Sequence, residues 1–343
     1  MKALVLLKNE ELKYMDIAFP VKKQQDSYLV KVIAAGICGS DLHRAFGHGA
    51  YYYPLIMGHE FSGIIEEGFR GARFKKGDRV VVFPLIPCRN CTSCQTGDYA
   101  QCINYDYMGS RSDGGFAQYI YVPESNIFII PGHIDIVHAA LTEPVAVALH
   151  GVRKINISPG STGVVYGGGF IGLVAAQWMR IRGAREVIVI EIDDKKLEIA
   201  KNMGFMTIDS RNGDPVEFIK SYTDESGADF AIEACGLPMT FIQSIKSVKN
   251  FGEVVFMGNI SGTFKIEEKD FSSILRREIK IYGTWNSKIV PRGKDDWSAS
   301  LKYMDKELVI GPMISHTPDL SQGVEVFNMI HAKTEFYNRV VFK

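Results

Sequence analysis

The chain has 343 residues, 46% of them hydrophobic and 23% charged, and its 39 basic and 39 acidic side chains cancel. Balanced charge excludes a global field that would draw the protein to nucleic acid or to an anionic membrane. No apolar run reaches the length of a membrane span, and the short apolar run at the start has neither the length nor the cleavage site of a secretory signal. We therefore expect a cytoplasmic globular protein, and its length predicts two domains.

Residues 1–130 are typical of a β-rich domain. Apolar and β-branched runs over 29–35, 79–83 and 116–122 are separated by glycine and proline, which indicates short strands. This pattern predicts a barrel-like, partly antiparallel domain. The segment 84–113 is long for a connection without structure of its own, so we expect something to order it.

Four of the six cysteines can account for an ordered structure in the segment 84–113. Cys88, Cys91, Cys94 and Cys102 follow the spacing C-x2-C-x2-C-x7-C, which is too clustered for a disulfide framework. Four thiolates on short loops can surround one zinc ion in a tetrahedron, so we predict a structural zinc lobe over 84–104. An iron–sulfur cluster is the alternative, but no proline follows the fourth cysteine. Cys235 lies in an apolar run and is interpreted as a core residue.

A second candidate metal site lies between Cys38 and Glu60. Cys38, His59 and Glu60 offer a thiolate, an imidazole and a carboxylate, a mixture that zinc accepts. A catalytic zinc needs three protein ligands and one open position. By itself, a single cysteine at a strand end is more often a small buried hydrophobe.

The pattern changes near residue 143, where a helix over 143–150 is predicted, and strands then alternate with helices. A strand over 163–166 runs into a glycine motif of the form G-x-G-x-x-G, and a helix follows over 173–181. The residues of that motif that we assign to cofactor binding are Gly167, Gly169, Phe170, Ile171 and Gly172. In this context the motif predicts that a dinucleotide pyrophosphate binds at the helix N-terminus.

Glu191 ends the next strand, over 187–190, and can accept hydrogen bonds from a ribose diol. A carboxylate there repels a 2′-phosphate, so we favour NAD over NADP. Further strands over 229–233, 253–257 and 279–283 complete a six-stranded parallel sheet. After it, a helix over 324–330 and a strand over 339–342 return to the first domain.

The predicted domains are a catalytic domain over 1–147, a nucleotide-binding domain over 148–286, and a return to the catalytic domain over 287–343.

Taken together, these motifs resemble the zinc-dependent medium-chain dehydrogenase/reductase superfamily over essentially the full length. Gly58-His59-Glu60, the four-cysteine lobe, Asp113 to Ala117 and Gly167 to Gly172 appear in that superfamily's order. The resemblance implies an α/β protein with a Rossmann domain and a GroES-like catalytic domain. Within the superfamily, the stretches 50–54, 58–63, 108–116 and 274–279 look most like the galactitol-1-phosphate 5-dehydrogenases.

Carried over residue by residue, the resemblance implies Cys38, His59 and Glu143 as ligands of a catalytic zinc, with Glu60 as a fourth candidate. The sequence does not decide between Glu60 and Glu143. Asp41 is then expected to accept the other N–H of His59 and to fix its tautomer. The chain would hold two zinc ions, one catalytic and one structural.

Ser40 and His43 are the expected proton path in a dehydrogenase of this kind. A bound zinc lowers the pKa of a coordinated oxygen from about 15.7 toward about 7, which makes loss of the hydroxyl proton feasible at neutral pH. Ser40 would take that proton and pass it through the nicotinamide ribose to His43, while hydride goes to the cofactor. The competing interpretation of His43 is an ordinary exposed loop histidine.

The substrate implied by the resemblance is a polyol phosphate, with oxidation of galactitol 1-phosphate to tagatose 6-phosphate as the specific expectation. Arg111 is our candidate for the phosphate, with Lys288 and Arg292 as weaker candidates, and Tyr51 and Trp285 are candidates to line the polyol pocket. The alternatives are a free polyol such as sorbitol or xylitol, or L-threonine. A zinc- and nucleotide-binding protein without catalysis is a further alternative, disfavoured because every expected ligand and relay residue is present.

Self-association is also expected. The last strand of the nucleotide domain, near 278–283, would leave an unpaired edge, which is a liability in a monomer. A homodimer or a homotetramer is predicted, and the sequence does not distinguish the two.

Overall fold

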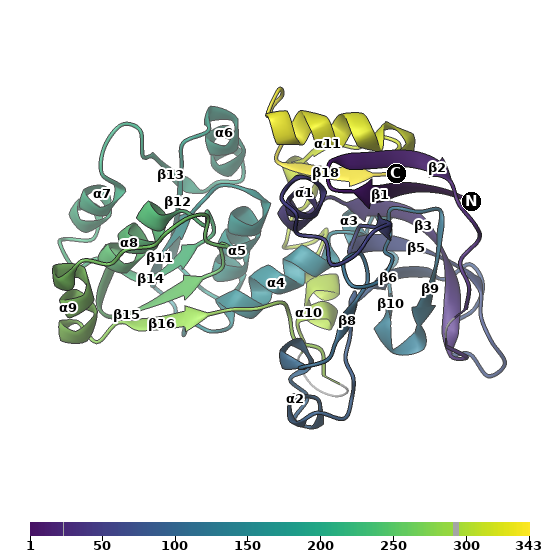
Figure 1. The fold of residues 1–343 in the computed structure, drawn as a ribbon. Helices are drawn as coiled ribbons and strands as arrows, with labels where there is room; N and C mark the ends of the chain where they lie inside the picture. Colours follow the sequence, from purple (N-terminus) through teal and green to yellow (C-terminus); the bar gives the residue numbers. More distant parts are fainter. Residues whose placement is uncertain (23, 291–294) are drawn as a thin grey trace. The chain divides into compact units, whose positions relative to one another are not determined.

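The computed structural model describes residues 1–22, 24–290 and 295–343. The chain forms two compact units (Figure 1), one made of Met1–Pro144 and Lys288–Lys343 and the other of Val145–Ser287. The chain therefore leaves the first unit once and later returns to it. None of the helices in these described ranges combines the length and the apolar character needed to cross a membrane.

The first unit is built mainly from antiparallel strands. A seven-stranded sheet has the order β10-β6-β5-β3-β18-β17, with β9 also pairing with β3, and smaller sheets have the orders β2-β1-β4 and β7-β8. The strands are β1 (Lys2–Lys8), β2 (Glu11–Asp16), β3 (Ser27–Gly36), β4 (Leu55–Ile56), β5 (Glu60–Glu67), β6 (Arg79–Val82), β7 (Leu85–Ile86), β8 (Asp106–Tyr107), β9 (Tyr119–Pro123), β10 (Ile127–Ile129), β17 (Ile314–His316) and β18 (Arg339–Phe342).

Short helices connect these strands and cover their ends. They are α1 (Gly39–Phe46), α2 (Thr92–Gln95), α3 (Ile136–Ala139), α10 (Asp296–Tyr303) and α11 (Gly323–Ala332), with 3₁₀ turns η1 (Tyr99–Gln101), η2 (Glu124–Asn126), η3 (Gly311–Met313) and η4 (Leu320–Gln322). The helix α4 (Thr142–Val152) carries the chain from the first unit into the second.

The returning C-terminal segment completes the core of the first unit. β18 pairs antiparallel with β3, so the last strand of the chain lies beside one of the first. The buried ring of Phe116 packs edge-on against Phe327 of α11 at 6.0 Å and against Phe342 of β18 at 5.3 Å between ring centroids. Aromatic pairs of this kind bury large apolar areas, so α11 and β18 are an integral part of this unit.

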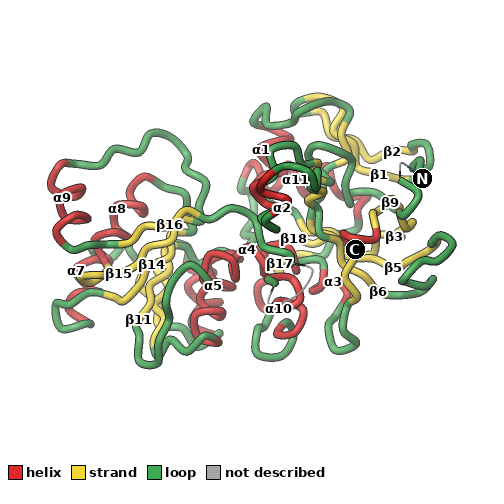
Figure 2. Tube along the Cα trace, turned by 90° about the horizontal axis from the view of Figure 1, so that it is seen from below, coloured by secondary structure: helices red, strands yellow, loops and turns green. Residues whose placement is uncertain are grey.

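The second unit is a six-stranded parallel sheet of order β13-β12-β11-β14-β15-β16. Figure 2 shows its strands lying side by side with helices flanking them. Its elements are β11 (Thr162–Tyr166), α5 (Phe170–Ile181), β12 (Glu186–Glu191), α6 (Asp194–Asn202), β13 (Met206–Asp209), α7 (Pro215–Tyr222), β14 (Ala228–Glu233), α8 (Pro238–Ser247), β15 (Val248–Phe256), α9 (Glu268–Arg276) and β16 (Lys280–Gly283).

The sequence explains why this sheet is parallel and central. Val164 and Val165 in β11, and Val187 to Val189 in β12, have no exposed surface, as expected for strands covered on both faces. Strand order reverses between β11 and β14, and open parallel sheets bind ligands at the carboxyl ends of the strands at such a point.

Most predicted elements are confirmed, and three details differ. The run 116–122 begins as a strand only at Tyr119, because the backbone of Phe116 bonds to Met57 and Leu4 instead of to β3. The strand β13 was not predicted, since Met206–Asp209 is too short to stand out. The interpretation of Cys235 as core is wrong: β14 ends at Glu233, and Cys235 is exposed in the loop that follows.

Candidate active site and metal centres

Cys38 stands where β3 ends and α1 begins. It is the N-cap residue of α1, and its backbone N–H donates to Asp41 Oδ2 at 3.0 Å. Asp41 thereby satisfies one of the N–H groups at the helix start, and it has no exposed surface. The Cys38 side chain is consequently held at the N-terminus of the helix.

His59 and Glu60 reach the same place from the start of β5. The ligand atoms of Cys38, His59 and Glu60 all lie within 4.8 Å of one another, and the histidine and the glutamate are 4% and 1% exposed. Gly36 permits this approach, because a Cβ at Gly36 would stand 2.5 Å from Glu60 Oε2. Gly58, before His59, has φ of +90°, a left-handed conformation that favours glycine.

Asp41 lies beside His59, whose Nδ1 has no hydrogen-bond partner among the described residues. His59 Nδ1 lies 3.4 Å from Asp41 Oδ1, and His59 Nε2 lies 4.0 Å from Glu60 Oε1. Burial lowers the pKa of His59, but the charges of Asp41 and Cys38 outweigh it, so the pKa is raised well above its ordinary value. A metal ion binds only the neutral ring.

The two carboxylates near this cluster have different partners. Arg339 of β18 donates to Glu60 Oε2, and both side chains are buried. Glu60 Oε1 is also buried and has no hydrogen-bond partner within residues 1–22, 24–290 and 295–343. An unpaired buried carboxylate oxygen beside a thiol and an imidazole fits a zinc ion.

Glu143, near the start of α4, is instead held by Tyr107. The Tyr107 hydroxyl donates to Glu143 Oε1 at 3.0 Å, and the Tyr107 ring lies 5.7 Å from that of His59. Burial raises the pKa of Glu143 to about 7, against the opposing effect of His59. Burial also raises the pKa of Tyr107, with Glu143 adding to the effect. Glu143 is thus next to the cluster. It is not one of the residues whose ligand atoms all lie within 4.8 Å of one another.

Ser40 and His43, the predicted proton path, both lie on α1. Ser40 Oγ accepts a hydrogen bond from Arg44 Nη1 at 2.9 Å. His43 is exposed, and its ring rests against the following loop, where side chains at Gly47 and Gly49 would collide with it. No contact between Ser40 and His43 themselves is observed, so the path remains a prediction.

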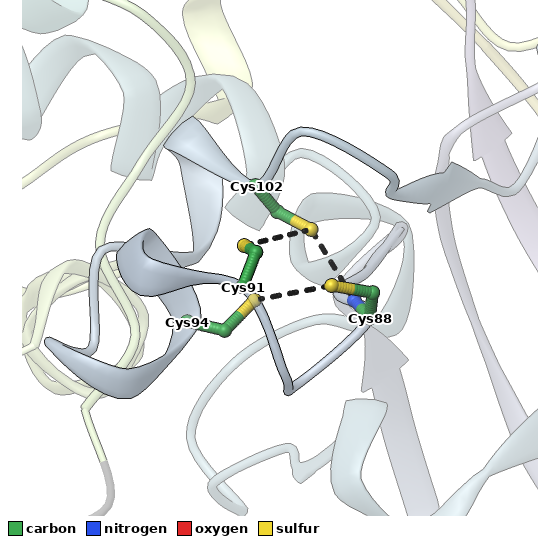
Figure 3. A group of neighbouring side chains, drawn as sticks. All are labelled: Cys88, Cys91, Cys94 and Cys102. Carbon is green, nitrogen blue, oxygen red and sulfur yellow. Dashed lines mark hydrogen bonds between the residues drawn. The ribbon is translucent and has the colours of Figure 1, made fainter.

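The four cysteines of the lobe converge on one point (Figure 3). Cys88 Sγ and Cys94 Sγ lie 3.9 Å apart, as do Cys91 Sγ and Cys102 Sγ, and all four sulfurs lie within 4.8 Å of one another. A tetrahedral zinc with bonds of about 2.3 Å separates its sulfurs by about 3.8 Å, whereas a disulfide needs about 2.05 Å. The donor set therefore fits a structural zinc.

Local backbone geometry prepares these thiols for a metal. Backbone N–H groups of Ile103 and Cys94 lower the pKa of Cys91 to about 6, and those of Asn90 and Cys91 lower the pKa of Cys88. Deprotonated thiolates are the form that binds zinc. The segment around them is ordered further by β7, α2, η1 and β8.

The glycine motif of the second unit has the predicted geometry. Gly167 has φ of +107°, and Gly169 is the N-cap residue of α5. A Cβ at Gly169 would meet no atom within 4 Å, whereas one at Gly172 would collide with the Gly167 carbonyl. The helix N-terminus is therefore open to a phosphate while helix and strand pack closely. Phe170 and Ile171 form the first turn of α5.

Glu191 stands at the end of β12 and contacts this motif. Its Oε2 accepts from the Gly168 N–H at 2.8 Å, and its Oε1 accepts from the N–H groups of Ile192 at 2.7 Å and Asp193 at 3.1 Å. These bonds fix the carboxylate beside the glycine loop. They place a negative charge where a ribose is expected.

The predicted substrate residues are distributed over both units. The Arg111 guanidinium carbon lies 4.6 Å from the ring centroid of Tyr51 and 4.4 Å from that of Tyr105. Lys288 is paired with Asp98 at 2.9 Å. Trp285 belongs to the second unit and is 53% exposed. Arg292 lies outside the described residues.

Sequence reasoning missed three residues of this site. Arg339 is far from Glu60 in the chain, and Tyr107 lies in a two-residue strand, so neither carried a local signal. Arg44 had one, because it follows Asp41 and Ser40 at the helical spacing that brings side chains together.

Comparison with known proteins agrees with this geometry. The sequence model of the alcohol dehydrogenase GroES-like domain matches residues 24–132, and that of the zinc-binding dehydrogenases matches residues 171–306. Galactitol 1-phosphate 5-dehydrogenase of Escherichia coli is 33% identical over 319 residues, which is 92% of each chain. This chain belongs to the zinc-binding alcohol dehydrogenase family. The resemblance noted from the sequence is thereby confirmed.

Solved structures of the family have the same fold. The crystal structure of galactitol-1-phosphate dehydrogenase from Escherichia coli matches with a TM-score of 0.91 and 31% identity, covering 100% of this chain and 99% of that one. A zinc-binding dehydrogenase from Sinorhizobium meliloti, bound to NADP, matches with a TM-score of 0.89 and 33% identity, covering 99% and 98%. The predicted fold class is confirmed.

Family membership leaves the substrate open. Sorbitol dehydrogenase of Bacillus subtilis is 35% identical over 301 residues, covering 85% of this chain and 84% of that protein. This identity is comparable with that of the galactitol 1-phosphate enzyme. The family therefore establishes a zinc-dependent alcohol or polyol dehydrogenase without choosing among polyols.

Proposed function

We propose that this protein oxidises a secondary alcohol of a polyol phosphate with NAD, and that galactitol 1-phosphate, giving tagatose 6-phosphate, is its substrate. The observation that carries the catalytic part is the convergence of Cys38, His59 and Glu60 around a buried, unpartnered carboxylate oxygen. We assign residues 1–147 and 287–343 to catalysis and 148–286 to NAD binding.

In this proposal, Cys38, His59 and Glu60 hold a catalytic zinc, with Glu143 as the exchanging carboxylate, while the four-cysteine lobe holds a structural one. When bound, zinc polarises the substrate hydroxyl as a Lewis acid, and NAD accepts hydride from the carbon that bears it. Asp41 Oδ1, 3.4 Å from Nδ1 of His59, would accept the N–H of that atom and so direct Nε2 at the ligand cluster. Arg339 prevents Glu60 from rotating away.

Ser40 accepts the substrate's hydroxyl proton as it gives up its own, and the electron pair left on the substrate oxygen forms the ketone carbonyl as hydride leaves the carbon. The proton then passes toward His43, whose exposed ring can release it to water.

The choice of NAD rests on Glu191. Its carboxylate is fixed beside Gly168, where the ribose of a bound dinucleotide is expected. A 2′-phosphate would meet that negative charge. Because a relative of similar identity is bound to NADP, the decisive measurement is the ratio of kcat/KM for NAD and NADP in the wild type and in Glu191→Ala. A ratio that Glu191→Ala leaves unchanged would refute this role.

The phosphate preference rests on Arg111. Its guanidinium lies against the rings of Tyr51 and Tyr105, and its Nη2 donates to the Tyr51 hydroxyl at 3.5 Å. No carboxylate among the described residues forms an ion pair with Arg111. The Tyr105 ring contacts that of Tyr107 at 6.3 Å, which links this cation to the zinc site within one unit. Tyr51 and Trp285 are proposed to contact the polyol.

The test is NADH formation by zinc-loaded protein with galactitol 1-phosphate, galactitol, sorbitol or L-threonine at equal concentrations. We expect a large preference for the phosphate ester, which Arg111→Met should reduce mainly by raising KM. Arg73→Met is the matched control, because Arg73 is also exposed and stacks on Phe74. Equal activity with galactitol would mean that the substrate is a free polyol. No activity with any of these substrates would favour a non-catalytic binding protein.

We also propose self-association as a homodimer or homotetramer through β16. In the described part of the chain this edge strand pairs only with β15, and Ile281 on it is 37% exposed. An unpaired strand edge is a template for pairing with a second copy. Light scattering of the wild type and of Ile281→Lys should show a multimer that the substitution dissociates.

A further inference from the structure

Arg44 bridges two residues that serve different purposes in the proposed mechanism. It lies one turn after them on α1, and its Nη1 donates to Ser40 Oγ at 2.9 Å and to Asp41 Oδ1 at 3.2 Å. The Arg44 side chain is only 14% exposed, and that of Asp41 is fully buried. A single nitrogen therefore ties the proposed proton acceptor to the carboxylate that orients His59.

The bond to Ser40 restricts how its hydroxyl can act. A guanidinium only donates hydrogen bonds and stays protonated in proteins, so one lone pair of Ser40 Oγ is occupied by Arg44. The hydroxyl hydrogen must then point away from Arg44. Without this bond, a serine in the first turn of a helix is free to bond to nearby backbone groups.

The bond to Asp41 restricts the other side of the site. Asp41 Oδ2 accepts from the Cys38 N–H, while Oδ1 faces both Arg44 Nη1 and His59 Nδ1, the latter at 3.4 Å. A buried carboxylate needs several donors to hold one orientation. Of the three groups that face Asp41, which are the Cys38 N–H, Arg44 and His59, only Arg44 carries a permanent positive charge.

We propose that Arg44 is a positioning residue that sets the Ser40 hydroxyl for proton transfer and holds Asp41 against His59. It couples the proton path to the zinc ligands without touching the substrate. This inference rests on the proposed function, which assigns Ser40 and His59 their roles.

The experiment compares Arg44→Met, Arg44→Lys and the control Arg276→Met in the zinc-loaded enzyme. Arg276 also bonds a serine one turn earlier, Ser272 at 3.2 Å, but on the exposed face of α9. The readouts are kcat and KM for the alcohol, the solvent deuterium isotope effect on kcat, and zinc release to a chromogenic chelator. Zinc release from the four-cysteine lobe is an internal reference.

Arg44→Met should lower kcat by roughly 10- to 100-fold, increase the solvent isotope effect and accelerate the release of one zinc, while KM changes little. Because one nitrogen makes both bonds, the lysine ammonium should restore most of each property. Arg276→Met should match the wild type. If Arg44→Met does not fold, Arg44→Gln replaces it, with the same criteria.

Wild-type values of kcat and zinc release in Arg44→Met would overturn the inference, and so would losses that Arg44→Lys does not recover. Zinc release does not require turnover. If the wild type oxidised none of the alcohols tested, the proposed function would fail while the link from Arg44 to the zinc ligands remained measurable.

Discussion

The four-cysteine lobe and the Cys38 site both offer donors for zinc, but they are built in opposite ways. The lobe takes all of its ligands from the short segment 88–102, and backbone N–H groups within residues 90–103 lower the pKa of two thiols. The Cys38 site takes its ligands from two elements, and Arg339 from the far end of the chain pairs with one of them. Local spacing thus defines the first site, and tertiary packing defines the second.

The largest expected effect is a loss of turnover when the Cys38 site, and not the four-cysteine lobe, is changed. Cys38→Ser replaces a thiolate in the catalytic cluster, and turnover should fall by roughly 10⁴-fold because several kcal/mol of electrostatic stabilisation are lost. Thermal stability and dinucleotide binding, measured by fluorescence titration, should stay close to wild type. A mild loss of turnover would mean that Cys38 is a core residue.

The next effect probes the dependence of the Cys38 site on the returning segment. Arg339→Met leaves the buried carboxylate of Glu60 without its cation, which should cost about 3–5 kcal/mol of unfolding free energy in the metal-free protein. Denaturant titration measures this cost, and Glu60→Gln in the same chain should recover part of it. Arg211→Met, which breaks an exposed ion pair, is the control and should change stability little.

The lobe should respond in the reverse manner. Cys91→Ser removes one of four zinc ligands, so the melting temperature should fall by roughly 5–10 °C. Turnover per folded molecule should stay near that of the wild type, because the lobe holds no group of the proposed mechanism. Equal effects of Cys91→Ser and Cys38→Ser on both measurements would contradict the division between the two sites.

The smallest effect concerns a second contact between distant segments. Nδ1 of His138, on α3, lies 2.8 Å from Asp305 Oδ1. The hydrogen bond to Asp305 raises the pKa of His138. The stabilisation is therefore complete below the unfolded pKa of about 6.5 and disappears as pH rises through the higher folded pKa. The pair is partly exposed, so it contributes no more than about 1 kcal/mol.

Unfolding of the wild type and of His138→Gln should be compared between pH 5 and pH 9. The difference in free energy should be largest at the acidic end and vanish at the alkaline end. A difference that does not change with pH would mean that His138 acts through packing alone.

The second unit shows which elements of the fold can be predicted from sequence periodicity alone. Buried β-branched runs and the glycine motif identified β11, α5 and β12, because a parallel sheet covered on both faces requires continuous apolar strands. The short strand β13 and the exposure of Cys235 were missed, since each depends on where a neighbouring strand ends. Such ends are decided by packing.

In the first unit, the strand run 116–122 was assigned too early for a similar reason. Phe116 is apolar and fits a strand, but its backbone bonds to other segments and its ring fills the core. The hydrophobic pattern predicts which side chains are buried. It does not predict which backbone group forms the hydrogen bond.

By itself, the sequence determined the two-unit architecture, the four-cysteine lobe and the dinucleotide motif, because short-range spacing and periodicity constrain each of them. It named Cys38 and His59 as metal donors and left Glu60 and Glu143 as alternatives. Only the tertiary structure decided that Arg339 engages Glu60, that Tyr107 holds Glu143 and that two tyrosines enclose Arg111. The pairs Arg339–Glu60, Tyr107–Glu143 and Tyr51–Arg111 each join separate segments of the chain, and the buried charges among them select their partners by proximity in the folded core.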